Sequence, residues 1–258
     1  RQAIERLLTE DVEAIAICLI NSFVNPVHEQ LILEVMQEMA PDLPCCVSYN
    51  VLPEIKEYER TSTTVINAYL LPVVASYLDS LVARLQDEGV QAPLLLMQSN
   101  GGLTTVDQTR SLPCHIIESG PAAGVWGAQR LCAELGQDSF IACDMGGTSF
   151  DACLVSGGNP ALTRDRELDF GLPLAIPVID IATLGAGGGS IARLDTSGRL
   201  EVGPEGTGAH PGPACYGKQK LQATVLDADL ILGHVGNEMR LADRTQKLDE
   251  RAAYQVVE

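Results

Sequence analysis

Two acids and a run of small polar residues lie close together near the middle of the sequence, in "DMGGTSFD" (residues 144–151). Asp144 and Asp151 are the predicted catalytic pair, and Asp144 is also a predicted metal ligand. Glycines let main-chain N–H groups approach a phosphate closely, and hydroxyls add further donors. The predicted phosphate-binding residues are Gly146, Gly147, Thr148 and Ser149. Carboxylates repel a bare phosphate, so the pattern favours a nucleotide whose charge is shielded by Mg²⁺, usually through water.

Apolar runs enter and leave this stretch, so "FIACDMGGTSFDACLV" (140–155) predicts two strands joined at "GGTS". The geometry puts both acids near the tip, opposite each other. No G-K-[ST] follows the glycines, which excludes a Walker A loop, and the returning strand excludes a dinucleotide fingerprint. A glycine hairpin with solvated acids and no ligand remains the alternative.

Two further glycine-rich stretches are candidates for ligand contact. In "GAGGGS" (185–190), three consecutive glycines weaken a strand and favour close approach of a ligand; a tight strand connection is the alternative. The nucleotide-binding residues predicted there are Gly187, Gly188, Gly189 and Ser190. In "SNGG" (99–102), a polar turn ends a predicted strand, where ligands of open α/β sheets bind. The substrate-binding residues predicted there are Asn100, Gly101 and Gly102.

The rest of the chain predicts the elements that hold these turns. A strand (12–22), a helix (25–40) and a strand (44–51) form a βαβ unit, which predicts a parallel sheet. A long helical pattern covers 61–89, and a glycine-bearing helix covers 118–136. The apolar residues that recur every four positions in the long helix predict one buried stripe: Val65, Tyr69, Val73, Tyr77, Leu81 and Leu85. At the start of this helix, Glu57 and Arg60 predict an ion pair, and contact with the ligand cleft is the alternative.

After Gly136 the pattern changes to strands and turns, including a hairpin turn at "DTSG" (195–198). This change places a domain boundary near residue 137, with one domain over 1–137 and a second over 138–258.

Composition narrows the classes of partner. The 258 residues carry a net charge of −17, which disfavours nucleic acid because phosphate backbones select Lys and Arg. The eight cysteines include no C-x-x-C pair, and several lie in apolar runs, as expected of reduced, buried thiols. No signal peptide opens the sequence and no apolar stretch predicts a membrane span. We therefore expect a cytoplasmic protein with no membrane partner.

Six motifs occur in a specific order, and each alone is weak: "EYERTSTTVINAYL" (57–70), "SNGGL" (99–103), "ESGPAAGV" (118–125), "DMGGTSFD" (144–151), "GAGGGSIA" (185–192) and "GPACYG" (212–217). As a set they resemble the hydantoinase A family, which includes N-methylhydantoinase, 5-oxoprolinase and the related subunits of acetone-type carboxylases. The D-x-G-G-T hairpin is similar to that of the actin, sugar kinase and Hsp70 superfamily. The resemblance implies a two-domain, ribonuclease H-like α/β fold, of which this chain is expected to be a central fragment.

The resemblance also implies a function: an ATP-dependent hydrolase that opens cyclic amides or imides of the hydantoin or 5-oxoproline type by phosphorylating the carbonyl. ATP and Mg²⁺ are the implied cofactors, and a second enzyme subunit is the implied partner. A subunit of an acetone-type carboxylase and a non-catalytic nucleotide-binding module are the alternatives. The fragment alone is expected to be inactive, because the first phosphate loop of the family is not in it.

Three positions depart from the family pattern. Relatives commonly carry a hydroxyl residue at position 150, where this chain has Phe150, and a histidine at position 182, where it has Ala182. They often carry an acid at position 210, where this chain has His210. His210 is predicted as a replacement metal ligand, with an ordinary loop histidine as the alternative.

Overall fold

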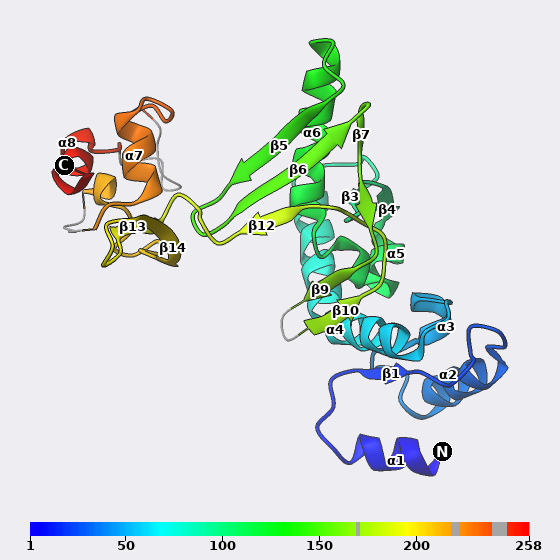
Figure 1. Cartoon of the computed structure of the whole chain (residues 1–258). Coiled ribbons are helices and arrows are strands. Elements are labelled where there is room, and N and C mark those ends of the chain that lie inside the picture. Colours follow the sequence, from blue (N-terminus) through cyan, green and yellow to red (C-terminus); the bar gives the residue numbers. More distant parts are fainter. Residues whose placement is uncertain (169–170, 218–221, 239–246, 258) are drawn as a thin grey trace. The chain divides into compact units, whose positions relative to one another are not determined.

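The computed structural model describes residues 1–168, 171–217, 222–238 and 247–257. The chain divides into two compact units, and each is described separately (Figure 1). The first unit contains residues 1–137 and 158–180, and the second contains residues 138–157 and 181–258. A boundary therefore falls between residues 137 and 138, where the sequence pattern changes. The structure does not have a single boundary, because the chain returns to the first unit over 158–180, where β10 (Leu172–Leu174) packs against the long helix α4 (Glu57–Asp87).

The βαβ prediction for the first unit is confirmed. β1 (Ile15–Ile17) pairs in parallel with β2 (Cys45–Val47), and α2 (Val27–Met39) connects them. Met36 of α2 is buried against the two strands, so the apolar face of the helix closes one small core. The other elements of this unit are α1 (Gln2–Leu8), α3 (Ser48–Val51), α4 (Glu57–Asp87), β3 (Leu95–Met97), β4 (Leu103–Thr105), α5 (Val106–Ser111), η1 (Pro113–Ile116), α6 (Ser119–Glu134), β7 (Asn159–Pro160), β8 (Leu162–Thr163), β9 (Arg166–Leu168), β10 (Leu172–Leu174) and β11 (Val178–Ile179).

α4 is the predicted long helix, but the prediction that its stripe is buried is wrong. Val65 is 52% exposed, Tyr69 75%, Val73 65% and Tyr77 59%. A four-residue apolar spacing identifies one face of a helix but does not say which face is covered. The buried face of the first half of α4 is instead largely polar. Its fully buried members are Arg60, Thr63, Thr64 and Asn67.

These buried polar side chains connect α4 to its neighbours. Asn67 donates through Nδ2 to the carbonyl of Ser111 at 3.1 Å and accepts from the Cys114 N–H at 3.2 Å. The Ala175 N–H donates to Thr63 Oγ1 at 3.1 Å. By length and composition alone α4 would be long enough and apolar enough to cross a membrane. Its hydrogen bonds within the first unit are those of a helix packed in a folded domain.

A second polar cluster lies where β1 and β2 end. The carboxylate of Glu29, fully buried, accepts from the Leu19 N–H at 2.7 Å, Ser48 Oγ at 2.7 Å and the Tyr49 N–H at 3.0 Å. Burial acts to raise the pKa of Glu29, but these hydrogen bonds outweigh it and the pKa is lowered. Arg60, also fully buried, donates to the Leu19 carbonyl and forms the predicted ion pair with Glu57, which is thereby confirmed.

The second unit is built on a long antiparallel hairpin. β5 (Phe140–Met145) pairs with β6 (Phe150–Ser156), and β12 (Ala182–Leu184) adds to the far edge of β6 (Figure 1). The predicted "DTSG" turn is confirmed, because β13 (Ser190–Leu194) and β14 (Leu200–Gly206) form a hairpin around it. The remaining elements of this unit are η3 (Ala214–Tyr216), α7 (Val225–Ile231) and α8 (Glu250–Val257).

Candidate functional site

The tip of the β5–β6 hairpin is a four-residue turn, Gly146 to Ser149, that follows the last strand pair, Met145 with Phe150. The Gly146 N–H closes the turn by donating to the Ser149 carbonyl at 3.0 Å. The other carbonyls of the tip are tied to the "GAGGGS" loop. The Gly187, Gly188 and Gly189 N–H groups donate to the carbonyls of Thr148 (3.2 Å), Gly146 (2.9 Å) and Gly147 (2.8 Å).

The main-chain donors of the tip are left available. Within the described part of the chain, the N–H groups of Gly147, Thr148 and Ser149 have no hydrogen-bond acceptor. Gly147 and Thr148 are exposed and Ser149 is half-buried, so the free donors lie at the surface of the second unit. A turn whose carbonyls are fixed on one side and whose N–H groups remain free has the donor arrangement that binds anions.

The glycine loop itself is buried behind the tip. A Cβ atom on Gly187 would lie 2.6 Å from the main-chain nitrogens of Thr148 and Ser149, and one on Gly189 would lie 2.8 Å from the carbonyl oxygen of Gly147. Both distances are shorter than real Cβ contacts allow, so these two positions require glycine. The packing accounts for the loop as a tight connection that supports the tip. Direct nucleotide contact by Gly187, Gly188, Gly189 and Ser190 stays a prediction.

The glycines of the tip differ from those of the loop. A Cβ on Gly147 would meet nothing within 4 Å, and one on Gly146 would meet only the Ser149 carbonyl at 3.8 Å. Neither residue has a positive φ. A left-handed backbone conformation is therefore not the reason for these glycines. The space beside Gly147 is open, so packing within the second unit does not require glycine at this position.

Three polar side chains form a row across the sheet beside this tip. Asp144 pairs directly with Asp151, and Asp151 pairs directly with Thr183 of β12. Directly paired residues of antiparallel strands share one face of the sheet. The two acids are therefore neighbours, as predicted. Thr183 is not among the predicted site residues. Strand alternation in "DIATL" separates it from Ala182 and Leu184, but only the pairing of β12 with β6 puts it on the same face as Asp151.

The opposite face of the same sheet is apolar. It carries Ile141, Cys143, Met145, Phe150, Ala152, Leu154, Ala182 and Leu184, because strand residues alternate between faces. Phe150 and Ala182, two departures from the family pattern, both lie on this side. A histidine in place of Ala182 would therefore project from the sheet face opposite Asp144 and Asp151.

The chemistry of the acid row fits a divalent cation. Neither Asp144 nor Asp151 forms an ion pair with a Lys or Arg in the described residues, although two like charges directly opposite each other destabilise a sheet. In the same part of the chain, no three His, Cys, Asp or Glu side chains gather to hold a metal ion. Mg²⁺ needs no such cage, since it is commonly held by one or two carboxylates, waters and substrate phosphates. His210 lies exposed in the turn before η3, and its role as a metal ligand stays a prediction.

The "SNGG" turn of the first unit is closed by its own side chains. Asn100 Oδ1 accepts from the Gly102 N–H at 2.8 Å, and Ser99 is buried with its carbonyl bonded to the Ile179 N–H. Gly101 has φ +85°, and a Cβ there would lie 1.7 Å from Trp126 Nε1. The fold alone therefore accounts for these residues. Substrate contact by Asn100, Gly101 and Gly102 stays a prediction.

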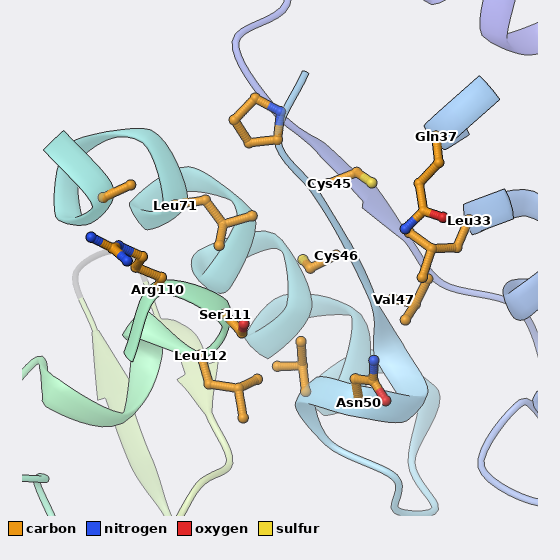
Figure 2. Close-up of a pocket in the computed structure, with 13 residues that line it drawn as sticks. Leu33, Gln37, Cys45, Cys46, Val47, Asn50, Leu71, Arg110, Ser111 and Leu112 are labelled. Atoms are coloured by element: carbon orange, nitrogen blue, oxygen red, sulfur yellow. The ribbon is translucent and has the colours of Figure 1, made fainter. Parts of the chain in front are cut away.

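A pocket of about 530 Å³ lies elsewhere in the first unit, around β2 (Figure 2). In Figure 2, Leu33 and Gln37 of α2 lie on one side of the strand, and Leu71, Arg110 and Leu112 lie on the other. Arg110 forms ion pairs with Asp79 and Asp107, so its charge is already balanced. Burial raises the pKa of Cys46 to about 11, so its thiol is protonated at neutral pH. The residues that line this pocket include none of the predicted site residues and offer no activated nucleophile.

Comparison with known proteins places this geometry in a family. A family model described as hydantoinase/oxoprolinase matches residues 60–258, and one described as hydantoinase/oxoprolinase N-terminal region matches residues 1–40. The chain is 40% identical over 255 residues to caprolactamase subunit alpha of Pseudomonas jessenii, covering 99% of this chain and 36% of that relative. It therefore spans about a third of the length of the relative.

Solved structures agree. The crystal structure of ATP-dependent caprolactamase from Pseudomonas jessenii matches with a TM-score of 0.82 and 41% identity, over 99% of this chain and 37% of that one. A nucleotide-free structure of acetone carboxylase, from work on ATP-dependent acetone carboxylation, matches with a TM-score of 0.71 and 27% identity, over 99% and 36%. The predicted mixed α/β fold is confirmed by these neighbours and is consistent with an actin-like ATPase. The chain belongs to the hydantoinase/oxoprolinase family.

Proposed function

We propose that this chain is part of an ATP-dependent hydrolase that opens cyclic amides, and that the β5–β6 tip binds the phosphates of the nucleotide. Family membership and the likeness to a caprolactamase support the substrate class. One observation carries the assignment of the tip. Its carbonyls are all bonded within the unit, while the N–H groups of Gly147, Thr148 and Ser149 have no acceptor among the described residues, and Gly147 and Thr148 are exposed.

The open space at Gly147 supports the same reading. Glycine loses more conformational entropy on folding than any other residue, so a glycine that the fold does not require needs another reason. Close approach of a phosphate to the main chain is such a reason, because a side chain there would stand in the way. In this proposal, Gly147 is therefore the residue of the tip whose main chain the nucleotide phosphates approach most closely.

The acid row would hold Mg²⁺ through Asp144 and Asp151, directly or through water. Bound there, Mg²⁺ would neutralise charge on the nucleotide phosphates. The amide of a cyclic substrate is stabilised by resonance. Transfer of the terminal phosphoryl group of ATP to its carbonyl oxygen, with release of ADP, would activate the carbonyl carbon. Addition of water there, cleavage of the ring C–N bond and release of phosphate would then open the ring. Such transfer needs positioning and charge neutralisation more than a reactive side chain. The free donors of the tip supply the positioning.

A carboxylase subunit is the second candidate, because acetone carboxylase shares the fold over 99% of this chain. The partner is proposed to be a second, separately encoded subunit, as the name caprolactamase subunit alpha implies for that relative. Cys18 and Cys143, which are not buried, are free thiols, and this supports the proposed cytoplasmic location.

Asp144→Asn in the full-length protein tests the site. We expect Mg²⁺-dependent ATP binding, measured by calorimetry, to weaken about tenfold or more, since a charged hydrogen-bonding group is lost. Asp138→Asn is the matched control, because Asp138 is an exposed acid of the same unit whose carboxylate accepts from Ser139 Oγ. Equal affinity in wild type and Asp144→Asn would contradict the assigned site.

Substrate-dependent ATP hydrolysis separates the two candidate functions. The full-length protein with its partner subunit is offered caprolactam, 5-oxoproline or N-methylhydantoin, and in parallel acetone with bicarbonate. Stimulation of ATP hydrolysis by a cyclic amide is the expected result. Stimulation only by ketone with bicarbonate would replace the hydrolase by the carboxylase.

A further inference from the structure

The two acids beside the tip are not equivalent, and the difference comes from β12. Thr183 Oγ1 donates to Asp151 Oδ1 at 2.7 Å. Asp144 has no hydrogen-bond or ion-pair partner in the described residues and is exposed, whereas Asp151 is half-buried. One carboxylate is therefore held in a defined orientation, and the other is free to turn.

The hydroxyl is the only polar side chain that β12 offers. Its neighbours along the strand, Ala182 and Leu184, lie on the opposite, apolar face. Thr183 pairs directly with Asp151 in the register, so its Cβ lies roughly 5 Å from that of the acid. An aliphatic residue here would fit the strand as well or better, because β-branched residues suit strands with or without a hydroxyl. The strand geometry alone therefore does not account for a threonine.

The same strand also supports the tip. After β12, the chain passes through Gly185 and Ala186 into Gly187, Gly188 and Gly189. The N–H groups of these three glycines donate hydrogen bonds to the carbonyls of the tip. One short segment thus fixes both the main-chain turn and the carboxylate next to it. Groups that must act together on one ligand gain from such shared support, because small displacements weaken every contact at once.

We propose that Thr183 is a positioning residue: its hydroxyl orients the Asp151 carboxylate for Mg²⁺, so that Thr183 sets the metal-dependent part of nucleotide affinity. The inference rests on the proposed function of the tip. The hydrogen bond occupies one lone-pair direction of Oδ1 and leaves Oδ2 open toward the cation or its water. Thr183 itself contacts neither nucleotide nor metal in this proposal.

The test compares Thr183→Val, which keeps the shape and removes the hydroxyl, with Thr183→Ser, which keeps the hydroxyl. ATP binding to the full-length protein is measured by calorimetry with Mg²⁺ and, separately, with EDTA. Thr183→Val should weaken Mg²⁺-dependent ATP binding about three- to tenfold, as expected for one hydrogen bond to a charged group. Binding in EDTA should not change, and Thr183→Ser should stay within about twofold of wild type. The melting temperature of each variant checks that the sheet is intact.

A double-mutant cycle with Asp151→Asn identifies the route of the effect. If Thr183 acts through Asp151, Thr183→Val should have no further effect once the carboxylate is gone. A persisting effect, an equal loss in EDTA, or no loss in Thr183→Val would each overturn the inference while the nucleotide site stands. If wild type itself binds no ATP with Mg²⁺, the proposed function fails, and this inference fails with it.

Discussion

The two glycine turns of this chain look alike in sequence and differ in structure. In "SNGG" of the first unit, Trp126 fills the space beside Gly101 and Asn100 satisfies the N–H of Gly102. In "MGGTS" of the second unit, the space beside Gly147 is empty, and the N–H groups of Gly147, Thr148 and Ser149 have no acceptor among the described residues. The first turn needs glycine for its own packing, and the second keeps glycine where packing makes no demand. Glycine pairs therefore indicate an anion site only when the fold leaves N–H groups of their turn without an acceptor.

Gly101→Ala should be the most damaging change, because it strains the closed turn. The residue has φ +85° and the added methyl collides with the indole of Trp126, so we expect a loss of about 2–5 kcal/mol in the free energy of unfolding of the first unit. Urea unfolding followed by the fluorescence of Trp126, the one tryptophan, measures it. Gly127→Ala in α6 is the control. It has open space and should be neutral or stabilising by up to about 1 kcal/mol. Equal effects of the two variants would remove the distinction between the turns.

Gly187→Ala should distort the tip of the β5–β6 hairpin, because Gly187 packs against the main chain of the tip. The methyl would press on the nitrogens of Thr148 and Ser149, and overpacking of about 1–3 kcal/mol corresponds to a loss of about 5- to 150-fold in Mg²⁺-dependent ATP affinity. Gly188→Ala is a control one residue away, because its methyl would make ordinary contacts at 3.6 and 3.7 Å. Calorimetry on the full-length protein measures both variants. A tip that tolerates Gly187→Ala as well as Gly188→Ala would not be held in the way described.

Glu29→Gln should show that the first unit depends on satisfied polar groups. A glutamine cannot accept all three hydrogen bonds that reach the carboxylate, so we expect the free energy of unfolding to fall by about 1–3 kcal/mol at pH 7. The pKa of Glu29 is lowered in the folded state, so its contribution is complete above the unfolded value of about 4.3 and is lost as the pH falls through the folded value. Wild type should therefore lose more stability on acidification than Glu29→Gln, as measured by urea unfolding at pH 7 and pH 3.5. Parallel pH profiles would argue against a role for this carboxylate.

Gly147→Ala should be the mildest change and the most diagnostic. Open space and an ordinary φ predict a change in the free energy of unfolding within about 0.5 kcal/mol. A methyl that stands between the main chain and a phosphate should nevertheless lower Mg²⁺-dependent ATP affinity about three- to tenfold. Unchanged affinity would mean that the tip approaches the nucleotide less closely than we propose.

Local patterns were reliable where they expressed a backbone requirement. The apolar runs on either side of "GGTS" predicted the hairpin, and its register brings Asp144 opposite Asp151 as expected. The strand–helix–strand spacing predicted the parallel pair β1–β2, because a short chain allows few other connections. The ion pair between Glu57 and Arg60 followed from helical spacing.

Predictions failed or stayed untested where the answer depends on distant residues. The stripe of Val65, Tyr69, Val73 and Tyr77 has the period of a helix face, but the face that is covered was decided by the partners of Thr63 and Asn67. The return of residues 158–180 to the first unit likewise depends on packing against α4 and leaves no local signal.

The sequence by itself determined which residues can offer N–H groups, hydroxyls and carboxylates together, because strand alternation and glycine geometry act over a few residues. Only the tertiary structure decided which glycines serve packing and which remain open, because that depends on atoms from elsewhere in the chain: Trp126 beside Gly101, and the 187–189 loop behind the hairpin tip. In the first turn the Gly102 N–H is already bonded to Asn100, whereas in the hairpin tip the carbonyls are bonded and the N–H groups of Gly147, Thr148 and Ser149 have no acceptor among the described residues.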